Sequence, residues 1–390
     1  MNFLRRASTR QLIIAIVAVI VIAAGSAVAF AGGGGPKPPH RSLAAALHDA
    51  ALGKPVQGVT ARVQFSDHLI PSASLGSSSP LVTGATGRIW AGDGKVRLEL
   101  QSSAGDTEIG FDGSRITVYD VASSTAYTLP LPRHSHPQAT DHPHHAVPAV
   151  SQIQKALAKL AQHVDLSGAI PGDIAGQPSY SVRISPRHSG GLLGSVQLAW
   201  DATHGVPLRI AVYSRTDSAP VLSLTVTDIS FGAVPASDLA VSPPAGTKIV
   251  RVHLPAHPKQ PASMRKAHQP DISGVSAVAA ALPFRLSAPA NVVGLPRKSV
   301  RLVDWAGTKA ALAVYGQGLG ALVVLEQPAT APAKGAPLAA LPTVSIRGAS
   351  GHELDTALGT LIQFDRAGVR YTVIGSLPQA AAEAAASAIG

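Results

Sequence analysis

The sequence predicts an α+β protein: an N-terminal transmembrane helix, a unit built mainly on antiparallel strands, and a small second α+β unit. Strands show most clearly between Ser195 and Gly246, where apolar side chains alternate with polar or small ones. A helix shows at 150–164, where apolar residues return every three or four positions. The length of 390 residues exceeds that of most single domains, so two folded domains are expected after the N-terminal segment.

The N-terminus has the pattern of a targeting segment. Three arginines within the first ten residues precede an uncharged, apolar run at 12–31, which is long enough to span a membrane. The positive flank predicts a cytoplasmic N-terminus and an extracytoplasmic remainder of the chain. Small residues near position 30 also suit cleavage, so residues 1–31 are either a signal anchor or a signal peptide that releases a secreted protein. Residues 32–41, rich in glycine and proline, form a linker.

The first folded unit is predicted at 42–252. Ser42 is placed to cap a short helix at 43–52, which Gly53 ends. Strands are expected next at 59–65, 87–91, 96–101, 107–111, 116–120 and 125–129. Asp-Gly turns follow the second and the fourth of them. A loop rich in serine and glycine is expected at 71–80. Further strands follow the helix at 150–164, and they are expected at 180–185, 196–200, 208–212 and 222–226.

The helix at 150–164 is amphipathic, because Ile153, Leu157 and Leu160 share one side with Val150 and Val164. Two interpretations stay open. The helix covers the open face of the sheet as ordinary core, or it is a lid over a cavity.

The second unit is predicted at 271–390, after a linker at 253–270 that is rich in proline and basic residues. A helix is expected at 272–282 and a low-complexity loop at 329–342. Strands are expected at 300–304, 310–315, 321–326, 344–346, 352–363 and 370–374, and a last helix begins at Leu377-Pro378.

Charge and cysteine content narrow the possible partners. The chain has 32 Lys and Arg against 22 Asp and Glu, and this excess of +10 favours polyanionic neighbours such as anionic lipid head groups. Nucleic acid is not expected, because the basic residues are scattered and the sequence contains no helix-turn-helix, zinc-finger or RNP-like pattern. With no cysteine in the chain, disulfides, thiolate nucleophiles and lipid-modified cysteines are excluded.

Motif searches do not favour an enzyme, and no cofactor is expected. The sequence has neither a G-x-S-x-G elbow nor an H-E-x-x-H helix, and the S-x-x-K at 263–266 lacks its companion motifs. The glycine-rich run at 316–320 lies between two expected strands. A phosphate cradle needs a following helix, so this run predicts a hairpin connection.

A histidine-rich segment precedes the amphipathic helix. Imidazoles at this density, with Asp141 among them, are ligands for zinc, copper or nickel. The alternative is a solvated loop whose histidines have no specific role, because no fixed scaffold orients them. The candidate ligands are His134, His136, His142, His144 and His145.

Several short segments of the first unit, taken in order, resemble the LolA-like family of bacterial lipoprotein carriers. The resemblance is to the type found among actinobacterial membrane-anchored homologues. The segments are Gly87-Arg88-Ile89-Trp90 with 96–100, Asp112-Gly113 with 118–120, 175–180, Trp200-Asp201 with 205–209, and 242–246. RseB-like regulators are similar in fold. The second unit resembles a small domain found behind such proteins. This chain departs from the family's lipoprotein members because it has no cysteine.

The resemblance implies a curved antiparallel half-barrel, covered by helices, whose apolar interior accepts acyl chains. Each buried methylene would contribute about 0.8 kcal/mol. The alternative is that the aliphatic side chains pack the interior shut. The apolar residues expected in the cavity are Leu98, Leu100, Ile109, Phe111, Ile116, Val118, Ile153, Leu157, Leu160, Leu198, Trp200, Leu208, Ile210, Leu222 and Leu224.

Three functions follow as hypotheses. The first is an extracytoplasmic protein that binds a lipid or a lipidated molecule. The second, from the RseB-like resemblance, is a regulatory module that contacts an anti-sigma factor or another envelope partner. The third is metal handling by the histidine-rich segment.

Overall fold

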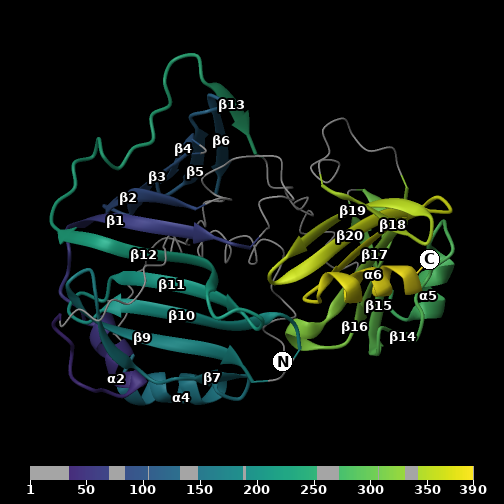
Figure 1. The fold of residues 1–390 in the computed structure, drawn as a ribbon, viewed down its shortest axis with the longest axis horizontal. Helices are drawn as coiled ribbons and strands as arrows, with labels where there is room; N and C mark the ends of the chain where they lie inside the picture. Colours follow the sequence, from purple (N-terminus) through teal and green to yellow (C-terminus); the bar gives the residue numbers. More distant parts are fainter. Residues whose placement is uncertain are drawn as a thin grey trace, which may run out of the picture.

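The computed structural model describes residues 35–69, 84–103, 105–131, 148–187, 190–252, 272–305, 307–329 and 341–389. The architecture is mixed α+β and mostly strands, in two sheets with few helices (Figure 1). In this part of the chain no helix is long and apolar enough to cross a membrane. The predicted segment 1–31, the loop at 71–80, the five histidines and the linker at 253–270 lie outside the described residues.

The larger sheet holds 13 of the described strands, all between residues 58 and 251. Its neighbours are antiparallel except for β13, which pairs with β6 in parallel. In space the strands follow the order β13-β6-β5-β4-β3-β2-β1-β12-β11-β10-β9-β7, with β8 also on β9. The strands are β1 (Gly58–Asp67), β2 (Ala85–Gly92), β3 (Lys95–Ser102), β4 (Gly105–Phe111), β5 (Arg115–Asp120), β6 (Thr125–Pro130), β7 (Val164–Leu166), β8 (Ile170–Ile174), β9 (Gln177–Pro186), β10 (Leu193–Asp201), β11 (Pro207–Ser214), β12 (Pro220–Phe231) and β13 (Lys248–Arg251).

This sheet curls into an open half-barrel, from β9 through β12 and β1 to β6 (Figure 1). Its inner face carries the apolar half of each alternating strand, including Val63, Leu98, Leu208 and Leu224. At Gly87, β2 approaches β3 so closely that a Cβ would lie 1.9 Å from the carbonyl oxygen of Glu99. Only glycine fits this approach. A register shift next to Val63 marks a bulge between β1 and β12, which adds bend and twist.

The first helix, α2 (Leu43–Ala51), forms as the sequence predicts. The hydroxyl of Ser42 accepts a hydrogen bond from the amide of Ala45 at 3.2 Å. The buried Ala46 packs against Tyr180 and Trp200, so α2 covers the β9–β10 part of the inner face. The Tyr180 hydroxyl donates to the carbonyl of Pro39 at 2.6 Å, which ties the preceding segment to the sheet.

The second helix, α4 (Val150–Leu160), is shorter than the predicted 150–164, because Val164 starts β7 and pairs with β9. It lies along α2 (Figure 1) and buries none of its residues. Ile153 and Leu157 are half-buried, and Leu160 is 43% exposed. The interpretation that this helix covers the sheet as ordinary core is therefore wrong: its contacts are with α2.

The turn between β10 and β11 has a structural role. The buried carboxylate of Asp201 accepts hydrogen bonds from the amide of Thr203 at 3.1 Å and from His204 Nδ1 at 2.8 Å. Gly205 has φ of +71°, and a Cβ there would lie 2.2 Å from the carbonyl oxygen of Ala50 at the end of α2. The segment from Trp200 to Gly205 therefore forms a turn against which the end of α2 packs.

The smaller sheet is antiparallel, in the order β14-β15-β16-β17-β21-β20-β19-β18, with helix α6 packed on β18, β20 and β21 and α5 on β15. The expected strand at 352–363 is two strands, because residues 357–358 form a turn. The elements are α5 (Val275–Ala281), β14 (Asn291–Val292), β15 (Leu295–Trp305), β16 (Thr308–Tyr315), η3 (Gly318–Gly320), β17 (Leu322–Pro328), β18 (Thr343–Ile346), β19 (Ala349–Thr356), β20 (Gly359–Arg366), β21 (Val369–Gly375) and α6 (Gln379–Ala388).

The glycine-rich run at 316–320 connects β16 to β17, as predicted, and it also touches the larger sheet. A Cβ on Gly320 would lie 2.8 Å from the Cα of Gly190, which precedes β10. Close by, the amide of Leu192 donates to the Ser376 hydroxyl at 2.8 Å. A close backbone approach and one hydrogen bond to a serine side chain therefore join the two sheets at this point.

The smaller sheet buries a carboxylic acid. Glu326 on β17 is fully buried, and its Oε2 accepts a hydrogen bond from the amide of Ser287 at 2.8 Å. Burial raises the pKa of Glu326 from 4.5 to about 7. Burial also raises the pKa of Tyr315 to about 12, and the negative charge of Glu326 adds to that increase. The core around Glu326 therefore favours the protonated acid.

Stability should fall as pH rises, because folded Glu326 holds a proton that the unfolded chain has already released. The stabilisation is fully present below about pH 4.5 and disappears gradually as the pH rises to about 7. The free energy of unfolding falls by roughly 3 kcal/mol over this range. We expect Glu326→Gln to reduce the difference in unfolding free energy between pH 5 and pH 8, measured by urea denaturation. Glu353, whose pKa burial also raises to about 7, stays in both proteins as the internal reference. An unchanged difference would contradict the assignment.

The curl of the larger sheet should not tolerate a side chain at position 87. We expect Gly87→Ala to lower the unfolding free energy by more than about 2 kcal/mol, because the added Cβ would collide with the β3 backbone. Gly232→Ala is the matched control, since a Cβ there meets no atom within 4 Å. Equal losses in the two variants would show that the close approach does not constrain the sheet.

Candidate functional site

A cavity of about 170 Å³ opens inside the half-barrel, between strands β1 to β3 on one side and β11 and β12 on the other. Its lining residues are aliphatic apart from Pro207 and Arg209. Leu208, Ile210 and Leu224 form one wall, and Ala61 and Ala91 form part of the other. The volume corresponds to about six molecules the size of water.

Strand pairing explains why space remains there. Ala61 lies opposite Ile89, and Ala91 lies opposite Val59, so each large side chain stands beside a small one. On the facing wall Ile210 pairs with Leu224. The small alanine side chains do not reach across the curl, and the space between the walls stays open.

The structure places the predicted cavity residues in five different surroundings. Leu208, Ile210 and Leu224 line the cavity. Leu98, Leu100, Ile109, Ile116, Phe111, Val118 and Leu198 belong to the same hydrophobic core but lie outside the lining. Trp200 packs with Tyr180 and α2, and Leu222 is half-buried outside the described core clusters. Ile153, Leu157 and Leu160 on α4 do not border the cavity.

Several lining residues, on β1, β2, β3 and β12 and directly before β11, were not predicted from the sequence. A signal for them was present, because Val59, Ala61 and Val63 alternate on β1, and Ile89 and Ala91 alternate on β2. The small alanines give no signal of this kind, because apolar periodicity identifies the side chains that fill a core and not the space they leave. The missed residues are Val59, Ala61, Ile89, Ala91, Val96, Val206, Val226 and Ile229.

Chemically, the cavity suits apolar ligands. Its one ionisable lining residue is Arg209, and the guanidinium of Arg209 donates to the Tyr213 hydroxyl at 3.3 Å. In the neighbouring cluster with Tyr180, Trp200 Nε1 is buried and has no hydrogen-bond partner among the described residues. Within the described ranges, no group of three or more His, Cys, Asp or Glu is placed to hold a metal ion. The inner face thus offers burial of apolar surface and little else.

Comparison with known proteins identifies fold neighbours only. The chain matches no family model. It also matches no curated protein. It is similar to solved structures of MucB. With MucB in complex with MucA(peri) it shares 17% identity over 89% of this chain and 98% of that chain, with a TM-score of 0.41.

Two further likenesses are of the same kind. The Pseudomonas aeruginosa MucA/MucB complex gives 17% identity, a TM-score of 0.40, and coverage of 89% of this chain and 96% of that chain. A LolA superfamily protein from Nitrosomonas europaea gives 12% identity and a TM-score of 0.21, over 52% of this chain and 99% of that chain. At these identities and TM-scores the likenesses do not indicate a function.

Proposed function

We propose that this protein binds an acyl chain of a lipid or of a lipidated molecule inside the half-barrel, on the outer side of the cytoplasmic membrane. The observation that carries the proposal is the aliphatic cavity of about 170 Å³ between the two walls of the sheet. Cavities lined by aliphatic side chains exclude water and accept apolar ligands. Binding of this kind needs neither a catalytic group nor a cofactor.

The size of the cavity sets the expected strength of binding. About six methylene groups fill it, and their burial contributes roughly 5 kcal/mol at about 0.8 kcal/mol each. A longer chain requires further opening of the half-barrel. The mechanism does not require α4 to move, because Ile153 and Leu157 do not border the cavity.

The chain organisation belongs to the same proposal and rests on the sequence. Residues 1–31 direct the protein to the membrane, where they stay as an anchor or are removed. Residues 42–252 form the binding domain and residues 271–390 a second domain, with linkers at 32–41 and 253–270. Each described sheet has a hydrophobic core of its own, which supports this division.

Filling the cavity should abolish binding without unfolding the protein. We expect Ala91→Leu to weaken the binding of a fluorescent fatty acid at least tenfold, because the larger side chain occupies the open space. Fluorescence titration of the purified extracytoplasmic part measures this effect, and circular dichroism checks the fold.

Ala280→Leu is the control, because it adds the same atoms at an exposed position of α5, which packs on the smaller sheet. The proposal fails when wild type does not bind the fatty acid, or when Ala91→Leu binds it as tightly as wild type does.

A second candidate function is regulation through contact with an anti-sigma factor or another envelope protein. The observation that favours it is the apolar side of α4, where Ile153 and Leu157 are half-buried and Leu160 is exposed. A partner that packed on this side of the helix would bury the exposed part of these side chains.

We expect Leu157→Glu to remove a partner that wild type retains from solubilised envelope membranes, because a charge would be desolvated in the contact. Gln154→Glu, on an exposed position of the same helix, is the control. This function would be contradicted if wild type and both variants retained the same partner, or if wild type retained no partner. Fatty-acid titration of Leu157→Glu separates it from the first proposal, since α4 lies away from the cavity.

A further inference from the structure

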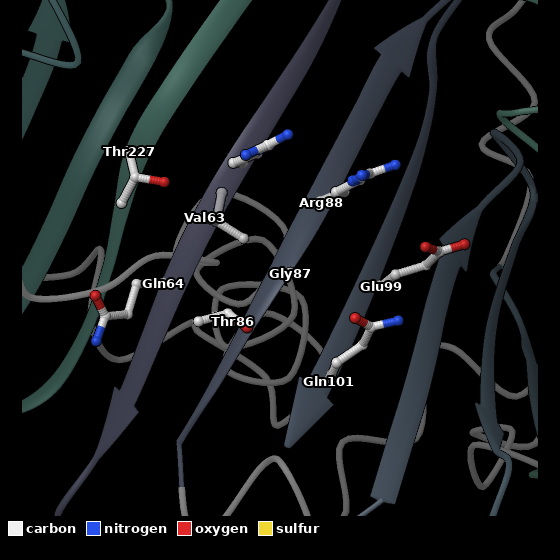
Figure 2. Close-up of a pocket in the computed structure, with 9 residues that line it drawn as sticks. Val63, Gln64, Thr86, Gly87, Arg88, Glu99, Gln101 and Thr227 are labelled. Carbon is white, nitrogen blue, oxygen red and sulfur yellow. The ribbon is translucent and has the colours of Figure 1, made fainter. Parts of the chain in front are cut away.

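The outer face of the same sheet carries a polar groove of about 480 Å³. It crosses strands β12, β1, β2 and β3, and its polar side chains include Arg62, Gln64, Arg88, Glu99, Gln101 and Thr227. Figure 2 shows these strands with Arg88, Glu99 and Gln101 near Gly87, which contributes no side chain. We call this the outer groove.

Two arginines face each other in the outer groove. Arg62 on β1 and Arg88 on β2 are direct cross-strand partners, and both side chains are exposed. Like charges at directly opposite positions destabilise a sheet. Neither guanidinium forms an ion pair or hydrogen bond with another described residue. The groove therefore holds two adjacent positive charges that no counter-ion among the described residues contacts.

Two acidic residues lie beside this pair without contacting it. Asp228 lies across from Arg62, and Glu99 lies across from Arg88, without forming ion pairs to them in the described structure. Glu99 is bound instead to Arg97, whose Nη2 also lies 3.3 Å from Glu108. One arginine thus holds both glutamates, and Arg62 and Arg88 stay available.

The rest of the groove supplies neutral hydrogen-bonding groups. The amides of Gln64 and Gln101 make no hydrogen bond to the other described residues, and the hydroxyl of Thr227 is exposed beside them. Each amide offers two donors and an acceptor. The backbone of Gly87 also borders the groove.

We propose that the outer groove binds a phosphate ester, with the phosphate held by Arg62 and Arg88 and its hydroxylated substituent held by the neutral side chains. Phosphate has acceptors enough for two guanidinium forks, whereas a carboxylate is satisfied by one. The volume of about 480 Å³ exceeds what a bare phosphate needs and leaves room for the substituent. The ester is either a free metabolite or a phospholipid head group.

This site is distinct from the acyl cavity. Arg62 and Arg88 point to the opposite side of the sheet from Ala61 and Ile89, because neighbouring residues on a strand face opposite ways. A single lipid cannot occupy both without passing through the sheet. The two proposals therefore stand or fall separately.

The test measures two probes against three variants. Glycerol 3-phosphate is titrated by calorimetry, and vesicles of phosphatidylcholine with or without phosphatidylglycerol are tested by co-sedimentation. We expect Arg62→Gln and Arg88→Gln each to weaken binding at least tenfold. Arg215→Gln, which changes an exposed arginine outside the groove, should bind as wild type does.

The outcomes separate the sources. Binding of glycerol 3-phosphate that both groove variants weaken supports a free ester. Binding only to phosphatidylglycerol vesicles, lost in the same variants, supports a lipid head group. The proposal is overturned when wild type binds neither probe, or when both groove variants bind like Arg215→Gln. Fatty-acid titration of the two variants should be unchanged, and their unfolding temperature should not fall, which shows that the fold and the acyl cavity are intact.

Discussion

The close approach of β2 to β3 is the constraint on which the rest of the larger sheet depends. Gly87 lets the β2 backbone come so near to Glu99 that no side chain fits between them. The sheet then curls, and the apolar face of each strand turns inward while the polar face turns outward. A flat sheet with the same pattern would lack the inner wall formed by Leu208 and Leu224 opposite Ala61.

The two faces of this sheet serve different chemistry. On the inner face, the alternation of Ala61 and Ala91 with larger neighbours leaves an apolar space whose ligand would be held by burial alone. On the outer face, register places Arg62 beside Arg88 and leaves their charges without a counter-ion among the described residues. One strand order and one register therefore produce both sites, and a shift of one residue would destroy both.

The smaller sheet packs around a buried acid, and it contacts the larger sheet through the Gly320 backbone and the Ser376 hydroxyl. Glu326 is stable there because burial favours its neutral form, which makes this part of the chain sensitive to pH. The glycine-rich run that ends at Gly320 was recognised from the sequence as a hairpin connection. Its contact with Gly190 could not be foreseen, because it joins segments 130 positions apart and involves no side-chain pattern.

The sequence by itself determined the α+β class, most strands and the helix capped by Ser42, because side-chain periodicity and capping are local properties. It also identified Leu208, Ile210 and Leu224 as inner-face residues, since the period of two assigns each to a face. Only the tertiary structure decided that Trp200 packs under α2, that α4 rests on α2, and that small residues border the cavity. Those outcomes depend on curl, register and distance between segments remote in the chain, which local patterns do not encode.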